Sequence, residues 1–108
     1  MNRGDLVTVS LPGDDGRPRP ALVIQSDLFS EVPSRTILPL TSTLTEGPLL
    51  RVAVEPSAGN GLRAPSQVMI DKASTVPADK LGPAFGTLDA AAMLAVTRSL
   101  ALFLGLAG

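Results

Sequence analysis

The sequence contains neither cysteine nor histidine among its 108 residues. Without thiolates and imidazoles the chain lacks the usual ligands of zinc fingers, iron–sulfur clusters and haem, and it lacks the thiol nucleophile and the imidazole base of many hydrolases. Any catalysis must therefore use arginine, lysine, carboxylate or hydroxyl groups. The absence of cysteine also agrees with a reducing compartment, and we expect the protein to be cytoplasmic.

Aromatic residues are scarce as well. Tryptophan and tyrosine are absent and Phe29, Phe85 and Phe103 are the only rings, whereas hydrophobic residues make up 44% of the chain. The core must be aliphatic, and no aromatic cluster offers a platform for stacking nucleic-acid bases. A net charge of -1 gives no sign of a strongly basic nucleic-acid-binding surface. At this length we expect residues 1–108 to form one domain with its own core.

The most apolar stretch runs from Leu88 to Leu106, which raises the question of a membrane span. A spanning helix needs about 20 residues with few charges. Asp89 and Arg98 interrupt this stretch, and the uninterrupted remainder after Arg98 is too short. We therefore expect a buried or interface helix and no membrane partner.

Ten glycines and ten prolines divide the rest of the chain into short aliphatic segments, a pattern typical of a β protein. The predicted strands are residues 5–11, 21–25, 36–41, 49–55, 67–71 and, after a kink, 73–76. The first strand alternates as a half-buried strand does, whereas 21–25 has the continuous apolar run of a strand buried on both faces. Residues 12–20 are predicted as a loop, and Pro39 marks a bulge or an edge.

Only the C-terminal region has helical spacing. Its periodic apolar residues are Met93, Val96, Leu100 and Phe103. Thr87 or Asp89 can cap this helix and Gly105 can end it. The other positions are also mostly apolar, so the helix must be covered on more than one side. We predict a homodimer, with a helix buried in the protein's own core as the alternative. The pattern as a whole predicts a mainly β fold, a small antiparallel barrel or bent sheet with a C-terminal α-helix.

Several short motifs occur in an order and spacing that resemble the MazF/PemK family of toxin endoribonucleases. They are Arg3 to Val7, Gly16 to Gln25, Pro39 to Ser42, Gly61-Leu62, Ser66 to Lys72, Ser74 to Val76 and Lys80 to Gly82. The resemblance spans nearly the whole chain. It implies a Src-homology-3-like barrel that dimerises and cleaves single-stranded mRNA at a specific sequence. It also implies neutralisation by a cognate antitoxin protein, and a reaction that needs no metal or other cofactor.

The resemblance assigns catalytic roles to four residues. RNA is cleaved when its own 2'-hydroxyl attacks the adjacent phosphorus, and the enzyme must stabilise the more negative phosphoryl group that results. Arg19, stiffened by a proline on each side, would supply charge and donors, and the hydroxyls of Thr41 and Ser42 would donate further hydrogen bonds. Asp71 would accept the 2'-proton. The general acid is unassigned, with Lys72 as a candidate.

Each of these residues also has a purely structural explanation. An arginine in a loop rich in proline and glycine is ordinarily a solvated turn residue, and hydroxyls at a strand end often bond to the next turn. Asp71 can pair with Lys72 or with an arginine. Basic side chains could nevertheless form a local groove on an acidic body, and Arg17, Arg63 and Lys72 are predicted to bind RNA there.

Some positions depart from the family pattern. Val7 and Thr8 stand where many relatives have tryptophan, Met69 where some have arginine, and Lys72 where glutamine is common. These changes concern proton transfer and the cleavage sequence rather than the fold. Two other functions are therefore kept: a non-enzymatic inhibitor of DNA gyrase like the CcdB toxins of the same fold, and an inactive barrel that serves as a binding module.

Overall fold

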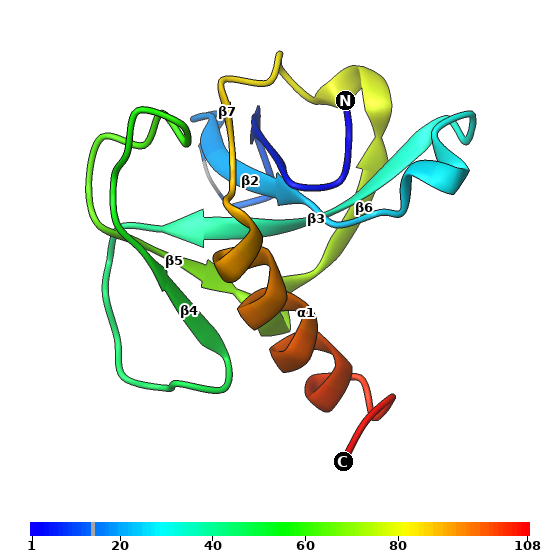
Figure 1. Ribbon diagram of the computed structural model, residues 1–108. Helices are drawn as coiled ribbons and strands as arrows, with labels where there is room; N and C mark the ends of the chain where they lie inside the picture. The colour runs from blue at the N-terminus through cyan, green and yellow to red at the C-terminus, as the bar shows by residue number, and fades with distance from the viewer. Residues whose placement is uncertain (14) are drawn as a thin grey trace.

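The computed structural model describes residues 1–13 and 15–108, which form a mainly β fold with one α-helix (Figure 1). Asp14, inside the predicted 12–20 loop, lies outside the described residues. The strands are β1 (Asp5–Val9), β2 (Arg19–Val23), β3 (Ser34–Thr41), β4 (Arg51–Val54), β5 (Ser66–Met69), β6 (Ser74–Pro77) and β7 (Gly86–Thr87). The helices are the α-helix α1 (Ala90–Phe103) and the short 3-10 helices η1 (Asp27–Phe29), η2 (Ile70–Lys72) and η3 (Ala78–Lys80).

The strands form one curled antiparallel sheet around the long central strand β3. Their order is β4-β5-β3-β2-β1-β7, and β6 also pairs with β3. On one edge β3 pairs with β2, and on the other it pairs first with β6 and then with β5. No ladder in the described part of the chain joins the end strands β4 and β7, so the sheet is strongly bent rather than closed. The predicted fold class, a mainly β barrel-like sheet with a C-terminal helix, is confirmed.

Both faces of this sheet bury aliphatic side chains. The core between the sheet and α1 includes Leu6, Leu22, Leu38, Leu40, Val68, Ile70 and Val96. The core on the opposite face contains Val7, Val9, Ala21, Val23 and Ile37, with Leu11, Val76 and Leu81 packed against it. The continuous burial predicted within 21–25 is confirmed for residues 21–23. The prediction that the first strand is half-buried is wrong. Leu6 and Val7 are both fully buried, because the curled sheet covers both faces of β1.

Pro39 lies in the central strand, not at an edge as one of the two predictions had it. β6 pairs with residues 34–37 of β3 and β5 pairs with residues 40–41, so Pro39 stands where the partner changes. The carbonyl of Thr36 accepts from the N–H of Ile24 in the β2 direction, and alternation then directs the backbone of Pro39 toward the opposite edge. A residue without an N–H is tolerated there because no ladder bond is lost.

Two element boundaries differ from the prediction, and each difference puts a candidate site residue in another element. Arg19 and Pro20 were predicted in the loop, but they begin β2, where Pro20 is opposite Thr8. The β2–β3 ladder starts only at Ala21, so Pro20 pairs with β1 but not with β3. Its missing N–H therefore removes no hydrogen bond on the β3 side. Asp71 was predicted on a strand, but β5 ends at Met69 and Asp71 lies in η2, the turn that forms the predicted kink before β6.

The helix α1 crosses one face of the sheet and contacts β4 and η2 (Figure 1). Asp89, rather than Thr87, caps it: its carboxylate accepts from the N–H of Ala92 at 2.8 Å. Gly105, with φ of +75°, follows its last turn as predicted. No helix of the described chain is long and apolar enough to cross a membrane.

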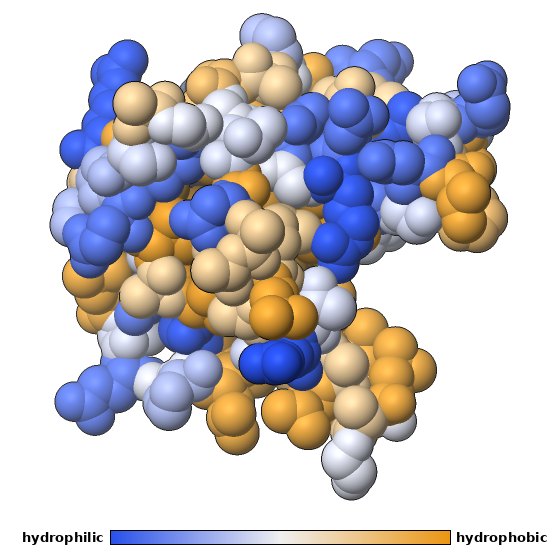
Figure 2. Space-filling view, viewed as in Figure 1, coloured by the Kyte–Doolittle hydropathy of each residue, from blue (hydrophilic) through white to orange (hydrophobic). Residues whose placement is uncertain are grey.

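The rest of the chain does not cover the outer side of α1. Val96 is fully buried and Met93 and Leu100 pack on the core, but Phe103 lies beyond it. Large apolar side chains on or after this helix are exposed, namely Leu94, Leu102, Phe103, Leu104 and Leu106. In Figure 2 apolar side chains gather at the lower right, over the C-terminal end of α1. The alternative of a helix fully buried within its own chain is therefore wrong.

Candidate active site

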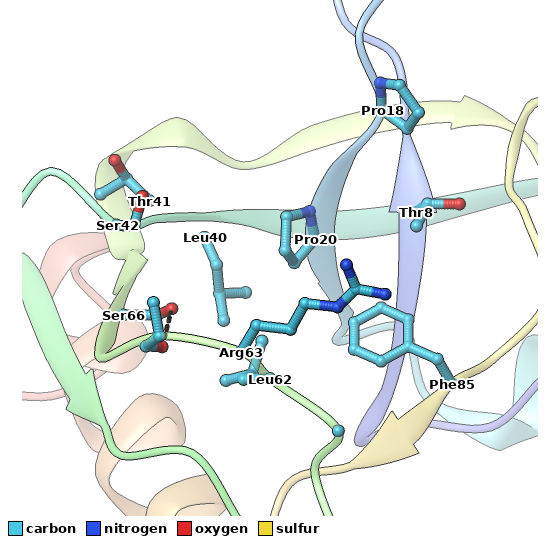
Figure 3. Close-up of a pocket in the computed structure, with 12 residues that line it drawn as sticks. Thr8, Pro18, Pro20, Leu40, Thr41, Ser42, Leu62, Arg63, Ser66 and Phe85 are labelled. Atoms are coloured by element: carbon cyan, nitrogen blue, oxygen red, sulfur yellow. Dashed lines mark hydrogen bonds between the residues drawn. The ribbon is translucent and has the colours of Figure 1, made fainter.

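A cleft of about 640 Å³ lies at the end of the sheet where β3 terminates (Figure 3). β1 and β2 contribute Thr8 and Pro20 to its walls. Further lining comes from Leu40, Thr41, Ser42, residues 61–64, Ser66 and Phe85. The cleft therefore collects segments that are far apart in the sequence, and we describe it from its two ends.

Hydroxyl groups occupy one end of the cleft. Thr41 is the last residue of β3, and its Oγ1 accepts from the N–H of Thr43 at 3.1 Å, so the hydroxyl proton is available for donation. The hydroxyl of Ser42 makes no hydrogen bond with the described residues. Ser66 uses its own hydroxyl to donate to the carbonyl of Ala64 at 2.9 Å. The structure thus brings Thr41 and Ser42 together in one cleft, as the sequence predicted, and one of the strand-end bonds expected of such hydroxyls is also present.

A cation and an aromatic ring occupy the opposite end. Figure 3 shows the side chain of Arg63 extending across the cleft, past Leu62 and Pro20, toward the ring of Phe85. Arg63 and Phe85 are both exposed. The predicted RNA-binding residue Arg63 therefore shares the cleft with Thr41 and Ser42. Phe85 is a site residue that sequence reasoning did not identify.

The wall that carries Arg63 is fixed by the buried side chain of Asn60. Its Oδ1 accepts from the N–H groups of Ser57 (2.9 Å) and Leu62 (3.0 Å), and its Nδ2 donates to the carbonyl of Glu55 at 2.8 Å. The N–H of Asn60 donates in return to the Ser57 hydroxyl at 3.1 Å. Such a satisfied buried amide holds a loop in one conformation. The only sequence signal for this was a polar residue beside glycines, which is common in ordinary turns.

Arg19 is placed beside the cleft, not in its lining. Its two neighbours Pro18 and Pro20 both line the cleft. Arg19 pairs with Val9 in the β1–β2 ladder, and strand alternation puts it on the same face as Val9, opposite to Pro20. Within one chain the structure therefore does not bring the Arg19 side chain onto the cleft wall that carries Thr41. Arg17, also predicted to bind RNA, is exposed in the segment before β2.

Asp71 lies at the other end of β5 from the cleft. Arg51 Nη1 donates to its Oδ1 at 2.5 Å, and Lys72 Nζ is 3.9 Å from its Oδ2. The hydrogen bond from Arg51 holds the pKa of the Asp71 carboxyl below its ordinary value. The structural alternative for Asp71, pairing with an arginine and with Lys72, is present, and one chain brings neither Asp71 nor Lys72 to the cleft. In this arrangement Asp71 is a weak base.

No group of three or more acidic side chains that could hold a metal ion occurs in the described part of the chain.

Comparison with known proteins places the sequence and fold in a toxin family. A model of the PemK-like, MazF-like toxins of type II toxin–antitoxin systems matches residues 2–104. The probable endoribonuclease MazF of Mycolicibacterium smegmatis is 43% identical over 109 aligned residues, with 100% of both chains covered. The chain belongs to this MazF-like toxin family, so the gyrase-inhibitor alternative is not favoured.

Solved structures agree with this assignment. The Mycobacterium tuberculosis toxin MazF-mt6 is 27% identical with a TM-score of 0.81, covering 96% of this chain and 99% of that one. An endoribonuclease from a mycobacterial species, solved in complex with its cognate antitoxin, is 25% identical with a TM-score of 0.84, covering 100% and 98% of the two chains. The resemblance inferred from short motifs is therefore confirmed along the whole chain.

Proposed function

We propose that the protein is an endoribonuclease toxin that cleaves single-stranded RNA in the cleft described above. The observation that carries this proposal is the shared cleft of Thr41, Ser42 and Arg63 in a chain of the MazF-like family. Hydroxyl donors and a permanent cation are the groups that a phosphodiester requires. Its relative of 43% identity is a probable endoribonuclease. We also propose that the protein acts in the cytoplasm.

The proposed reaction uses the substrate's own 2'-hydroxyl. The 2'-hydroxyl gives its proton to solvent water as its oxygen bonds to the adjacent phosphorus. The bond from phosphorus to the 5'-oxygen breaks and that oxygen takes a proton from water, which leaves a 2',3'-cyclic phosphate and a 5'-hydroxyl. The non-bridging oxygens gain charge in the transition state. We propose that the Thr41 hydroxyl, which lines the cleft with Ser42, donates to one of them. Since Asp71 is held by Arg51 away from the cleft, we assign it no proton transfer.

Arg19 is proposed as the cation that stabilises the transition state. It begins β2 at the rim of the cleft, between two prolines that line it. Its side chain is long and flexible, and its guanidinium offers a fork of donors that matches a phosphate. This role requires the Arg19 side chain to turn toward the cleft when RNA binds.

Two protein partners are proposed. A second copy of the chain would cover the exposed apolar side of α1, since Leu94 and Leu102 lie on one side of the helix and a twofold interface pairs a surface with itself. A cognate antitoxin is supported by the relative that was solved with one. We propose that an acidic and apolar segment of the antitoxin covers the basic cleft and competes with RNA.

A cleavage assay in EDTA tests the proposed function. The purified protein, its Arg19→Ala variant and its Arg19→Lys variant are incubated with a mixed single-stranded RNA, and 5' ends are sequenced. We expect the wild type to cut at a short recurring sequence. Both variants should lose at least about a hundredfold in kcat, because alanine removes the cation and lysine lacks the planar fork of the guanidinium.

A gyrase supercoiling assay on the same wild-type preparation is the control for the alternative toxin function. Gyrase inhibition without RNA cleavage would contradict the proposed function. Undiminished cleavage by folded Arg19→Ala would remove Arg19 from the site but leave the nuclease.

A further inference from the structure

We infer that Phe85, with Arg63 beside it, forms a base-stacking subsite that holds one unpaired nucleobase next to the scissile phosphate. This inference rests on the proposed function, because it places the phosphate at the Thr41–Ser42 end of the same cleft. The two ends are separated by an apolar floor that includes Pro20 and Leu40 (Figure 3). In a bound RNA the scissile phosphate would therefore lie at the hydroxyls of Thr41 and Ser42. The base of a neighbouring nucleotide would stack on the Phe85 ring.

Phe85 is not required to fill the core. Its side chain is 38% exposed and belongs to neither of the two buried clusters. Phe29 and Phe103, the other two rings of the chain, do not line the cleft. An aromatic face open to a cleft that also carries a guanidinium is the combination that binds unpaired bases, because every base offers a π-face and the cation attracts the adjoining phosphate.

The backbone holds Phe85 at the cleft wall by close contacts with the loop that carries Arg63. The N–H of Phe85 donates to the carbonyl of Leu6 at 2.9 Å. Gly61 has φ of +67°, and a Cβ there would stand 2.8 Å from the Phe85 carbonyl oxygen and 3.1 Å from a ring carbon. A Cβ at Gly86 would stand 2.2 Å from the carbonyl oxygen of Asn60. Only glycine permits both approaches, so the ring is positioned before any ligand arrives.

The charge at this end of the cleft suits a nucleotide. Arg63 is the cation of the lining, and none of the described residues that line the cleft is acidic. The guanidinium points toward the Phe85 ring in Figure 3, so a base on the ring brings its own phosphate or ribose within reach of Arg63. We therefore assign the ring to the base and Arg63 to the backbone of the same nucleotide.

Binding and cleavage measured side by side test this subsite. The binding probe is a fluorescent single-stranded RNA of randomised sequence with 2'-O-methyl riboses, which has no 2'-hydroxyl to attack. The variants are Phe85→Leu, Phe85→Tyr, and Phe29→Leu as a matched loss of an exposed ring outside the cleft. We expect Phe85→Leu to raise the Kd for this probe and the KM for cleavable RNA about tenfold, with kcat changed less than threefold.

The tyrosine variant and Phe29→Leu should keep both constants within about twofold, because tyrosine retains the aromatic face and Phe29 lies elsewhere. An unchanged Kd in folded Phe85→Leu, or an equal loss in Phe85→Tyr, overturns the subsite. If the wild type cleaves RNA and Phe85→Leu binds it normally, only this inference fails. If the wild type binds the probe but cleaves no RNA, and Phe85→Leu weakens that binding, the subsite stands and the proposed nuclease function fails.

Discussion

The side-chain amide of Gln67 makes two hydrogen bonds with the main chain of Thr45. Gln67 Nε2 donates to the Thr45 carbonyl at 2.8 Å, and the N–H of Thr45 donates to Gln67 Oε1 at 3.1 Å. Gln67 also lies directly opposite Thr41 in the β3–β5 ladder. The segment between Thr41 and Thr45, which carries Ser42, is therefore fixed at both of its ends, and the hydroxyl end of the cleft is preorganised.

Thr41→Val tests the role of this hydroxyl, because valine keeps the branched shape and removes the donor. We expect kcat for RNA cleavage to fall at least about a hundredfold, the usual effect of deleting one donor to a developing oxyanion. Thr41→Ser retains the donor and should stay within about tenfold of the wild type. Steady-state kinetics on one RNA that the wild type cuts measure all three proteins. A folded Thr41→Val with normal kcat would show that the hydroxyl serves only the turn at Thr43.

Arg63→Ala tests whether the cation in the cleft contacts the RNA backbone. Each phosphate contact on single-stranded nucleic acid contributes about 0.7 to the slope of log K against log salt concentration. We expect the variant to bind RNA more weakly and to lose about that amount of slope. Lys80→Ala removes the same charge from η3, outside the cleft lining, and should leave the slope unchanged. Equal slopes for the wild type and Arg63→Ala would place Arg63 outside the RNA path.

The ion pair between Arg51 and Asp71 predicts a stability that depends on pH. The pKa of Asp71 is lowered in the folded state, so its contribution is present above the carboxyl's unfolded pKa, about 4, and is lost as pH falls through the lower folded value. Asp71→Asn should lower the free energy of unfolding by about 1 kcal/mol at pH 7. The difference from the wild type should shrink below about pH 4. Urea unfolding at several pH values measures it.

The same variant separates structure from catalysis at Asp71. Because Asp71 lies at the far end of β5 from the cleft, Asp71→Asn should keep kcat within about threefold of the wild type at a temperature where both proteins are folded. A loss of a hundredfold or more in the folded variant would contradict this and restore the general-base role that the family resemblance implied for Asp71.

The parts of the fold that the sequence predicted correctly have local signals. The aliphatic run at residues 21–23, the carboxylate cap at Asp89 and the glycine at Gly105 each act within a few residues, and each is found where it was expected. The motif order carried the family assignment. The family resemblance also selected the hydroxyl pair of Thr41 and Ser42, which comes at the end of β3, where the chain leaves the sheet.

The remaining parts of the site depend on pairings between distant segments. Phe85 reaches the cleft only because Gly61 and Gly86 let two loops approach closely, and a single sequence does not show which loops meet. The face of the sheet on which the Arg19 side chain lies depended on whether Arg19 belonged to a loop or to the start of β2. That choice was set by its register opposite Val9, not by the prolines around it. Asp71 met Arg51 for the same reason, across the β4–β5 pair.

Leu102→Glu tests whether a second copy of the chain covers α1. Leu102 is 49% exposed on the outer side of the helix, so a glutamate there is tolerated by the folded monomer but places a charge in any interface that buries this side. We expect sedimentation equilibrium to give a dimer for the wild type and mainly monomer for the variant at micromolar concentration. Leu28→Glu is the matched control, because Leu28 is 89% exposed and belongs to η1 rather than to α1, so the substitution should leave the dimer intact. A wild-type monomer, or a dimer that both substitutions leave unchanged, would mean that α1 is not the contact between copies.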